Sequence, residues 1–215
     1  MTATVAPRLS AHGLVFAYPG RPLFNAWSHE FGAGLTWVRG HNGCGKSTLL
    51  RLLGGVLDPL AGHLQLDNID AKNQPLDYRR QVYWCGPDGV AFDHLKPTEY
   101  FGFVAGLYPR FSTGEAAVLV EALGLAPFLN QRISRLSTGT QRKVAVIAAI
   151  AAGTSAVLLD EPLAALDQAS LSVLRSYLAK TATQTDRIWI VTSHEPLGDA
   201  DLRAAVLDLP RTEPA

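Results

Sequence analysis

Long hydrophobic runs are missing from this chain of 215 residues. The longest uncharged apolar stretch is VAVIAAIAA, residues 144–152. A membrane-spanning helix needs roughly twenty such residues, so this stretch predicts a buried helix instead. The first residues, MTATVAPRLSAHG, lack the positively charged and apolar segments of a secretory signal. We therefore expect neither a membrane span nor a secretory leader in the sequence.

Cysteine is scarce, and neither sign of charge is in excess. Cys44 and Cys85 are too few for a disulfide framework and lack the spacing of a metal site, which indicates a reduced, cytoplasmic compartment. Lys and Arg number 19, as do Asp and Glu, so the formal net charge is zero. Because no long basic run stands out either, we expect no nucleic-acid partner.

Apolar strands and helical segments alternate along the chain, except in one stretch. Strands are expected at 9–17, 27–31, 35–38, 156–160, 188–192 and 205–209, with a short one closing at 83–84 and turns with short strands over 58–70. Helices are expected at 46–54 and 167–182. Between residues 98 and 152 only helical runs occur, at 100–107, 114–123 and 139–152. We predict a single α/β domain over 1–215, with a helical subdomain inserted at about 90–150.

A glycine-rich loop follows the apolar strand at 35–38. It matches the pattern G-x-x-x-x-G-K-[ST] in Gly40-His41-Asn42-Gly43-Cys44-Gly45-Lys46-Ser47, and Thr48 comes next. In such a loop, backbone N–H groups surround phosphate oxygens, the lysine reaches the β- and γ-phosphates, and the serine hydroxyl can bind Mg²⁺. The helix that follows directs its N-terminus at the same charge. The sequence therefore predicts an ATP or GTP site.

Cys44 lies inside this loop and has two interpretations. It is a small residue tolerated at a variable position, or its thiol is made reactive by the nearby helix N-terminus.

A pair of carboxylates ends the strand at 156–160. The sequence there is Ala156-Val157-Leu158-Leu159-Asp160-Glu161. In a phosphate-loop protein, an acid at this strand end holds Mg²⁺. A second acid can deprotonate the attacking water. We assign Asp160, with Ser47, to the metal and Glu161 to the general base.

A second helix opens with small hydroxyl residues and a glycine, in Leu136-Ser137-Thr138-Gly139-Thr140. Such a start is an ordinary N-cap. Its free N–H groups also make it suited to an anion.

Five ordered motifs together resemble those of the ATP-binding cassette (ABC) ATPases, the motor subunits of ABC transporters. They are Walker A (40–47), a signature-like LSTGT (136–140), Walker B (157–161), a D-loop-like LAALD (163–167) and an H-loop histidine, His194, in TSHE. The resemblance covers nearly the whole chain. It implies a P-loop NTPase core, with a mostly parallel sheet, flanking helices and an antiparallel β subdomain, plus the helical insert.

The resemblance also implies roles for individual residues. Two cassettes, identical or not, would close head to tail, so that Ser137 and Gly139 contact ATP held by the partner. His194 would contact the γ-phosphate and help to hold Glu161. Tyr18 would stack on adenine, although Phe16 and Tyr18 share a strand face and both could be core residues. The implied cofactors are ATP and Mg²⁺.

The chain departs from the family pattern at two places. Thr138 and Thr140 replace the third and fifth residues of the usual LSGGQ signature. Where the family has a Q-loop glutamine, this chain has Gly86-Pro87-Asp88-Gly89. Asp88 either binds Mg²⁺ or leaves the ligand missing and hydrolysis slow. The following Phe92-Asp93-His94-Leu95 still resembles the family's loop for a membrane subunit.

The function implied is that of an ATP-hydrolysing transporter subunit, attached to the inner face of the cell membrane. It would couple ATP-driven dimerisation to transport by separate integral membrane permease subunits. Only residues 195–215 follow His194, which resembles small export ATPases. The alternatives are a cassette ATPase acting on nucleic acid or ribosomes, and a nucleotide-dependent switch with poor catalysis. The retention of Glu161 and His194 argues against the switch.

Overall fold

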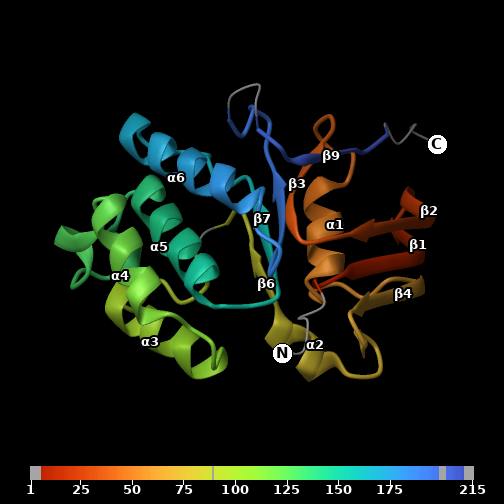
Figure 1. Ribbon diagram of the computed structural model, residues 1–215, viewed down its shortest axis with the longest axis horizontal. Coiled ribbons are helices and arrows are strands. Elements are labelled where there is room, and N and C mark those ends of the chain that lie inside the picture. The colour runs from red at the N-terminus through yellow and green to blue at the C-terminus, as the bar shows by residue number, and fades with distance from the viewer. Residues whose placement is uncertain (1–5, 89, 199–201, 211–215) are drawn as a thin grey trace.

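The computed structural model describes residues 6–88, 90–198 and 202–210. Two β-sheets and a group of helices form its layers (Figure 1). The first sheet has the order β2-β1-β4-β5 and is antiparallel, with the strands β1 (Leu9–Tyr18), β2 (Arg21–Phe31), β4 (Ala61–Leu66) and β5 (Ile69–Asp70). The second has the order β6-β7-β8-β3-β9 and is parallel, with β3 (Gly34–Arg39), β6 (Val82–Cys85), β7 (Ala156–Asp160), β8 (Ile188–Thr192) and β9 (Ala205–Asp208).

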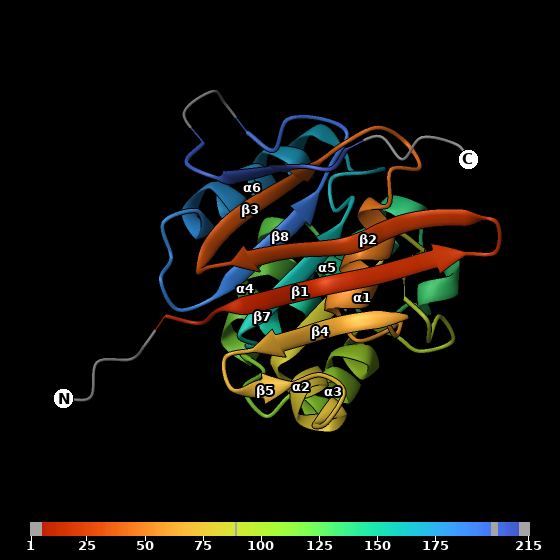
Figure 2. The ribbon, with the colours of Figure 1, turned by 90° about the vertical axis from the view of Figure 1, so that its right-hand side faces the viewer.

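Helix α1 (Lys46–Leu53) lies between the two sheets, and Figure 2 shows the antiparallel sheet as the outer layer on that side. The other face of the parallel sheet is covered by helices. These are α3 (Pro97–Leu107), α4 (Thr113–Ala122), α5 (Thr138–Ala151) and α6 (Gln168–Thr181). Two short 3₁₀ turns, Ala126–Phe128 and Ile133–Arg135, connect α4 to α5. The fold is thus the α/β arrangement that the sequence predicts.

Strand β7 shows why this layering buries so much apolar surface. All five of its residues are buried. Val157 and Leu159 join the core cluster that contains α5, whereas Ala156 and Leu158 join the cluster that contains α1. Alternate side chains of a strand point to opposite faces, and a parallel strand covered on both sides is apolar throughout. The strand therefore holds the carboxylate at its end, Asp160, in a rigid core.

Three elements differ from the sequence prediction by more than one residue at an end. Helix α2 (Pro75–Gln81) was not expected, although Pro75 at its first turn and Arg79 and Arg80 in its last turn are typical helix signals. Strand β2 begins at Arg21, not at residue 27, because its first half, although mostly exposed, still pairs with β1. Helix α3 begins earlier as well, at Pro97, where the Glu99 side chain accepts a hydrogen bond from the backbone N–H of Lys96.

Within the described ranges, no helix is both long and apolar enough to cross a membrane.

Candidate active site

The glycine-rich loop connects β3 to α1 in a conformation that depends on its glycines. Gly43 and Gly45 have φ values of 78° and 103°, in the left-handed region that glycine adopts without strain. The Lys46 ammonium donates hydrogen bonds to the carbonyl oxygens of Gly40, at 2.9 Å, and His41, at 3.4 Å. Gly45 caps α1 without a side-chain hydrogen bond, so the first N–H groups of the helix have no side-chain cap. This arrangement suits a phosphate group.

A cavity of about 380 Å³ opens beside this loop. It brings together residues from four separate segments of the sequence. They are Tyr18, Arg21, Leu23, Asn42, Gly43, Gly45, Lys46, Ser47, Thr48, Glu161 and His194. Gly40, His41 and Cys44 do not line it. Cys44 is only 4% exposed, and a Cβ on Gly40 would press against its sulfur, so Cys44 packs beneath the loop.

Tyr18 lies at the rim of the cavity and is 39% exposed. Its hydroxyl is 3.4 Å from that of Thr48, and its ring meets Phe16 edge to face. Phe16 is buried, whereas Tyr18 is open to a ligand. The geometry therefore leaves Tyr18 free to stack on a base.

Asp160 and Glu161 are held by the neighbouring strand β8. The Thr192 hydroxyl donates a hydrogen bond to Asp160 Oδ1 at 2.7 Å and accepts one from the Glu161 N–H at 3.0 Å. Glu161 Oε2 accepts a hydrogen bond from the His194 N–H at 3.2 Å, and His194 Nε2 lies 3.4 Å from Oε1. Thr192 thus positions both acids. Sequence reasoning gave it no role, because the contact depends on how β7 and β8 pair.

The second oxygen of Asp160 fits a metal role. Oδ2 is buried and has no hydrogen-bond partner among the residues that the structure describes. An unpartnered buried carboxylate oxygen is costly unless a cation or water meets it. Mg²⁺ takes oxygen ligands, usually one or two protein oxygens with phosphates and water. Ser47, whose hydroxyl is such a ligand, lines the cavity. Asp160 and Ser47 therefore suit Mg²⁺.

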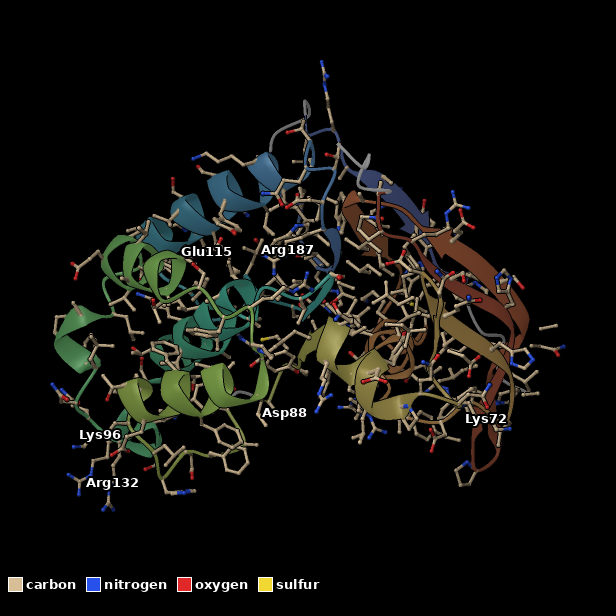
Figure 3. The ribbon with its side chains drawn as sticks, turned by 60° about the horizontal axis from the view of Figure 1, so that its bottom comes forward. Lys72, Asp88, Lys96, Glu115, Arg132 and Arg187 are labelled. Carbon is tan, nitrogen blue, oxygen red and sulfur yellow. The ribbon has the colours of Figure 1, made fainter. Side chains whose placement is uncertain are left out.

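Asp88 lies apart from these residues. Its carboxylate is 3.8 Å from the guanidinium of Arg51 and its side chain is 86% exposed. It does not line the cavity. In Figure 3, Asp88 lies at the junction between the helical half of the molecule and the half formed by the sheets. The arrangement gives no support to Asp88 as a metal ligand, and that role stays a prediction.

The signature-like residues also lie outside the cavity. Ser137 is the N-cap of α5, and its hydroxyl accepts a hydrogen bond from the Thr140 N–H at 3.2 Å. Gly139 packs against the carbonyl oxygen of Ala165, so closely that a Cβ would overlap it. Asp167 caps α6 and pairs with Lys143 at 2.8 Å, which holds the pKa of Asp167 well below its usual range. The N-cap interpretation of the segment 136–140 is therefore correct. The contact of Ser137 and Gly139 with a second chain stays a prediction.

Comparison with known proteins agrees with this site. The family model described as ABC transporter matches residues 29–164. The cytochrome c biogenesis ATP-binding export protein CcmA of Pseudomonas syringae pv. syringae is 34% identical over 203 residues, covering 91% of this chain and 94% of that protein. CcmA of Idiomarina loihiensis is 32% identical over 210 residues, covering 97% and 95%.

Solved structures share the fold. A putative ABC transporter ATP-binding protein from Pyrococcus furiosus superposes with a TM-score of 0.75 at 22% identity, over 94% of this chain and 97% of that one. A dimeric ATP-binding cassette in a post-hydrolysis state with ADP and Pi gives 0.72 at 22% identity, over 87% and 88%. The phosphate loop, Glu161 and His194 line one cavity, and the buried Asp160 directly precedes Glu161. The chain belongs to the ABC transporter family and is an ATP-hydrolysing transporter subunit.

Proposed function

We propose that this chain drives export as the ATPase subunit of a transporter whose membrane-spanning subunits are separate polypeptides. It works at the inner face of the membrane, where it pairs head to tail with a second cassette. The observation that carries the proposal is the meeting of Lys46, Glu161 and His194 around one cavity. Export is supported by the names of the CcmA relatives, which match the chain over most of its length. Nothing in the site favours the nucleic-acid alternative.

The proposed chemistry assigns one task to each group. Lys46 and the N–H groups of the loop bind the β- and γ-phosphates, and Tyr18 stacks on the base. Glu161 accepts a proton from the attacking water, and His194 orients that carboxylate through the contacts described above. Mg²⁺, held through Ser47 and Asp160, neutralises charge on the phosphates when it is bound. Ser137 and Gly139 donate to the γ-phosphate of the partner's ATP.

The relatives' names also indicate a process to test. Deleting the gene in the native cell should abolish c-type cytochromes, detected by haem staining of membrane proteins. The wild-type chain should restore them, and the Glu161→Gln chain should not. Normal cytochromes in the deletion strain would contradict a role in cytochrome c biogenesis.

The transporter role itself is tested by capture of the tagged chain from gently solubilised native membranes. A multi-span membrane protein should come with it in stoichiometric amount. Ribosomes or nucleic acid in its place would overturn the proposal and support the alternative.

A further inference from the structure

Arg142 is a buried cation that the site described above does not use. It lies in the second turn of α5 and is 5% exposed. Its Nη1 donates a hydrogen bond to the Gly86 carbonyl oxygen at 2.7 Å, and its Nη2 donates to that of Pro87. These carbonyls belong to the loop after β6, more than fifty positions away in the sequence. The guanidinium therefore connects two distant segments.

In the described part of the chain, this contact is unusual because backbone carbonyl groups, and no carboxylate, meet the buried charge. Among the described residues, none of the ion pairs includes Arg142. Burying a guanidinium is costly unless its donors are satisfied. An apolar side chain of similar length would fill the same space without that cost. The planar fork of the guanidinium, however, can hold two successive carbonyl groups at once.

The same turns of α5 are held from the other side by the loop after β7. Gly139 packs against the Ala165 carbonyl oxygen, and Lys143 pairs with Asp167 at 2.8 Å. The N-terminus of α5, which carries Ser137, thus lies between two loops that follow adjacent strands of the parallel sheet. One of these loops directly follows Asp160 and Glu161.

The loop after β6 also reaches the helix that follows the phosphate loop. Asp88 approaches Arg51 of α1 at 3.8 Å, and the Arg51 guanidinium lies over the Trp84 ring at 5.6 Å. Figure 3 shows Asp88 at the junction of the two halves of the molecule. A displacement of this loop would therefore act on α1 through a weak, exposed ion pair, and on α5 through a buried, double hydrogen bond.

We propose that Arg142 is a positioning residue for hydrolysis, fastening the loop Gly86–Asp88 to the first turns of α5. It fixes the position of Ser137 and Gly139 relative to Glu161, and it transmits any displacement of the loop to these two residues. This inference rests on the proposed function, because Ser137 and Gly139 matter only when a second cassette closes on them. It gives the loop a mechanical role that needs no metal-binding side chain at residue 88.

The test compares Arg142→Met, Arg142→Lys and the control Arg132→Met. Arg132 is exposed and, in Figure 3, lies beside Lys96 at the outer edge of the helical half, far from Asp88. Arg142→Met should lower kcat at saturating ATP by about tenfold or more, because a misplacement on the order of 1 Å costs up to about a hundredfold. ATP affinity of the single chain should stay within about twofold. Arg142→Lys should recover part of kcat, and Arg132→Met should change neither quantity.

A readout independent of turnover accompanies the kinetics. Hydrogen exchange of the backbone around residues 86–88 should speed up in both Arg142 variants and not in the control. Unchanged exchange and unchanged kcat in Arg142→Met would overturn the proposal. An equal loss of ATP affinity and kcat, without recovery in Arg142→Lys, would reduce Arg142 to a packing role. If Arg142→Met does not fold, kcat and hydrogen exchange around residues 86–88 are compared between Arg142→Lys and wild type, and unchanged values of both would overturn the proposal.

Failure of the proposed function would look different. In that case the Glu161→Gln chain would form no dimer with ATP, and the wild-type ATPase would not be stimulated by a membrane partner, while the exchange difference at residues 86–88 would remain.

Discussion

At the scale of single residues, the phosphate loop depends on an ammonium group that braces the loop from within. Lys46 is 6% exposed, and its donors satisfy the carbonyl oxygens of Gly40 and His41. A bound nucleotide would add phosphate oxygens as further acceptors for the same group. The side chain thus contributes both loop conformation and charge.

Replacing Lys46 with alanine should therefore weaken ATP binding strongly. Charge-assisted hydrogen bonds contribute roughly 1.5–3 kcal/mol, so the affinity should fall at least tenfold. Calorimetric titration with ATP measures this. Lys72→Ala is the matched control, because Lys72 is exposed and does not line the cavity. In Figure 3 it lies on the half of the molecule formed by the sheets. Equal affinities for the two variants would contradict the assignment of the phosphate loop.

Cys85 predicts a pH dependence of stability. Burial raises the pKa of its thiol from 9.0 to about 11, although the nearby Arg142 opposes the shift. Because the folded-state pKa is the higher one, this contribution to stability is complete below pH 9 and is lost as the pH rises through 11. By pH 10 the loss should be about 1 kcal/mol.

Urea unfolding of wild type and Cys85→Ala at pH 8, 9 and 10 isolates this contribution, since the buried tyrosines are common to both chains. The alanine variant should lose stability less steeply with pH. Parallel curves for the two chains would show that the thiol does not titrate as inferred.

At the scale of elements, α5 illustrates how a helix can be placed by the loops it touches. Its buried residues from Val144 to Ala151 form a continuous apolar segment, which anchors it against the parallel sheet. Its N-terminal turns instead meet loops on two sides, at Gly139, Arg142 and Lys143. The apolar segment fixes how closely the helix packs against the sheet, and the loop contacts fix the position of Ser137.

Gly139→Ala should disturb this placement. A Cβ there would overlap the Ala165 carbonyl oxygen, so the loop after β7 must shift, at a cost of roughly 1–3 kcal/mol in unfolding free energy. Hydrolysis should fall as well. Gly106→Ala in α3 serves as the control, because a Cβ at Gly106 would meet no neighbouring atom within 4 Å. It should be neutral or gain up to about 1 kcal/mol from helix propensity. Thermal unfolding measures the stability of both variants, and ATPase assays measure their rates of hydrolysis. Equal stability and equal rates for Gly139→Ala and Gly106→Ala would contradict the close packing of α5.

The elements that sequence reasoning identified are those whose pattern is local. Strands β7 and β8 are continuous apolar runs, and their predicted bounds are the observed ones. Helix α2 is short and mostly exposed, so its sequence has no apolar periodicity from which a helix could be predicted. Thr192 and Arg142 escaped notice because their partners are distant in the sequence. Those of Thr192 lie 31 and 32 residues away, and those of Arg142 lie 55 and 56 residues away. Such contacts follow from strand pairing and helix packing, which no local pattern contains.

At the scale of the whole molecule, the cavity is built from one set of motifs and leaves another outside. Lys46, Glu161 and His194 line it, whereas Ser137 and Gly139 do not. Ser137 is exposed at the N-terminus of a 14-residue helix. Helix N-termini attract anions, and the γ-phosphate of ATP bound to a second chain would be such an anion for the N-terminus of α5. This placement agrees with the proposal that two chains complete one site.

Glu161→Gln tests the two-chain site. The change removes the base but keeps the size of the side chain, so ATP should bind as before while hydrolysis falls by about a hundredfold or more. With ATP, size-exclusion chromatography of this variant should show a dimer that the wild type does not accumulate. Adding Ser137→Arg should return the protein to a monomer, because the bulk and charge enter the interface, and each chain should still bind ATP. A monomeric Glu161→Gln chain at saturating ATP, or a dimer that tolerates Ser137→Arg, would contradict closure through the N-terminus of α5.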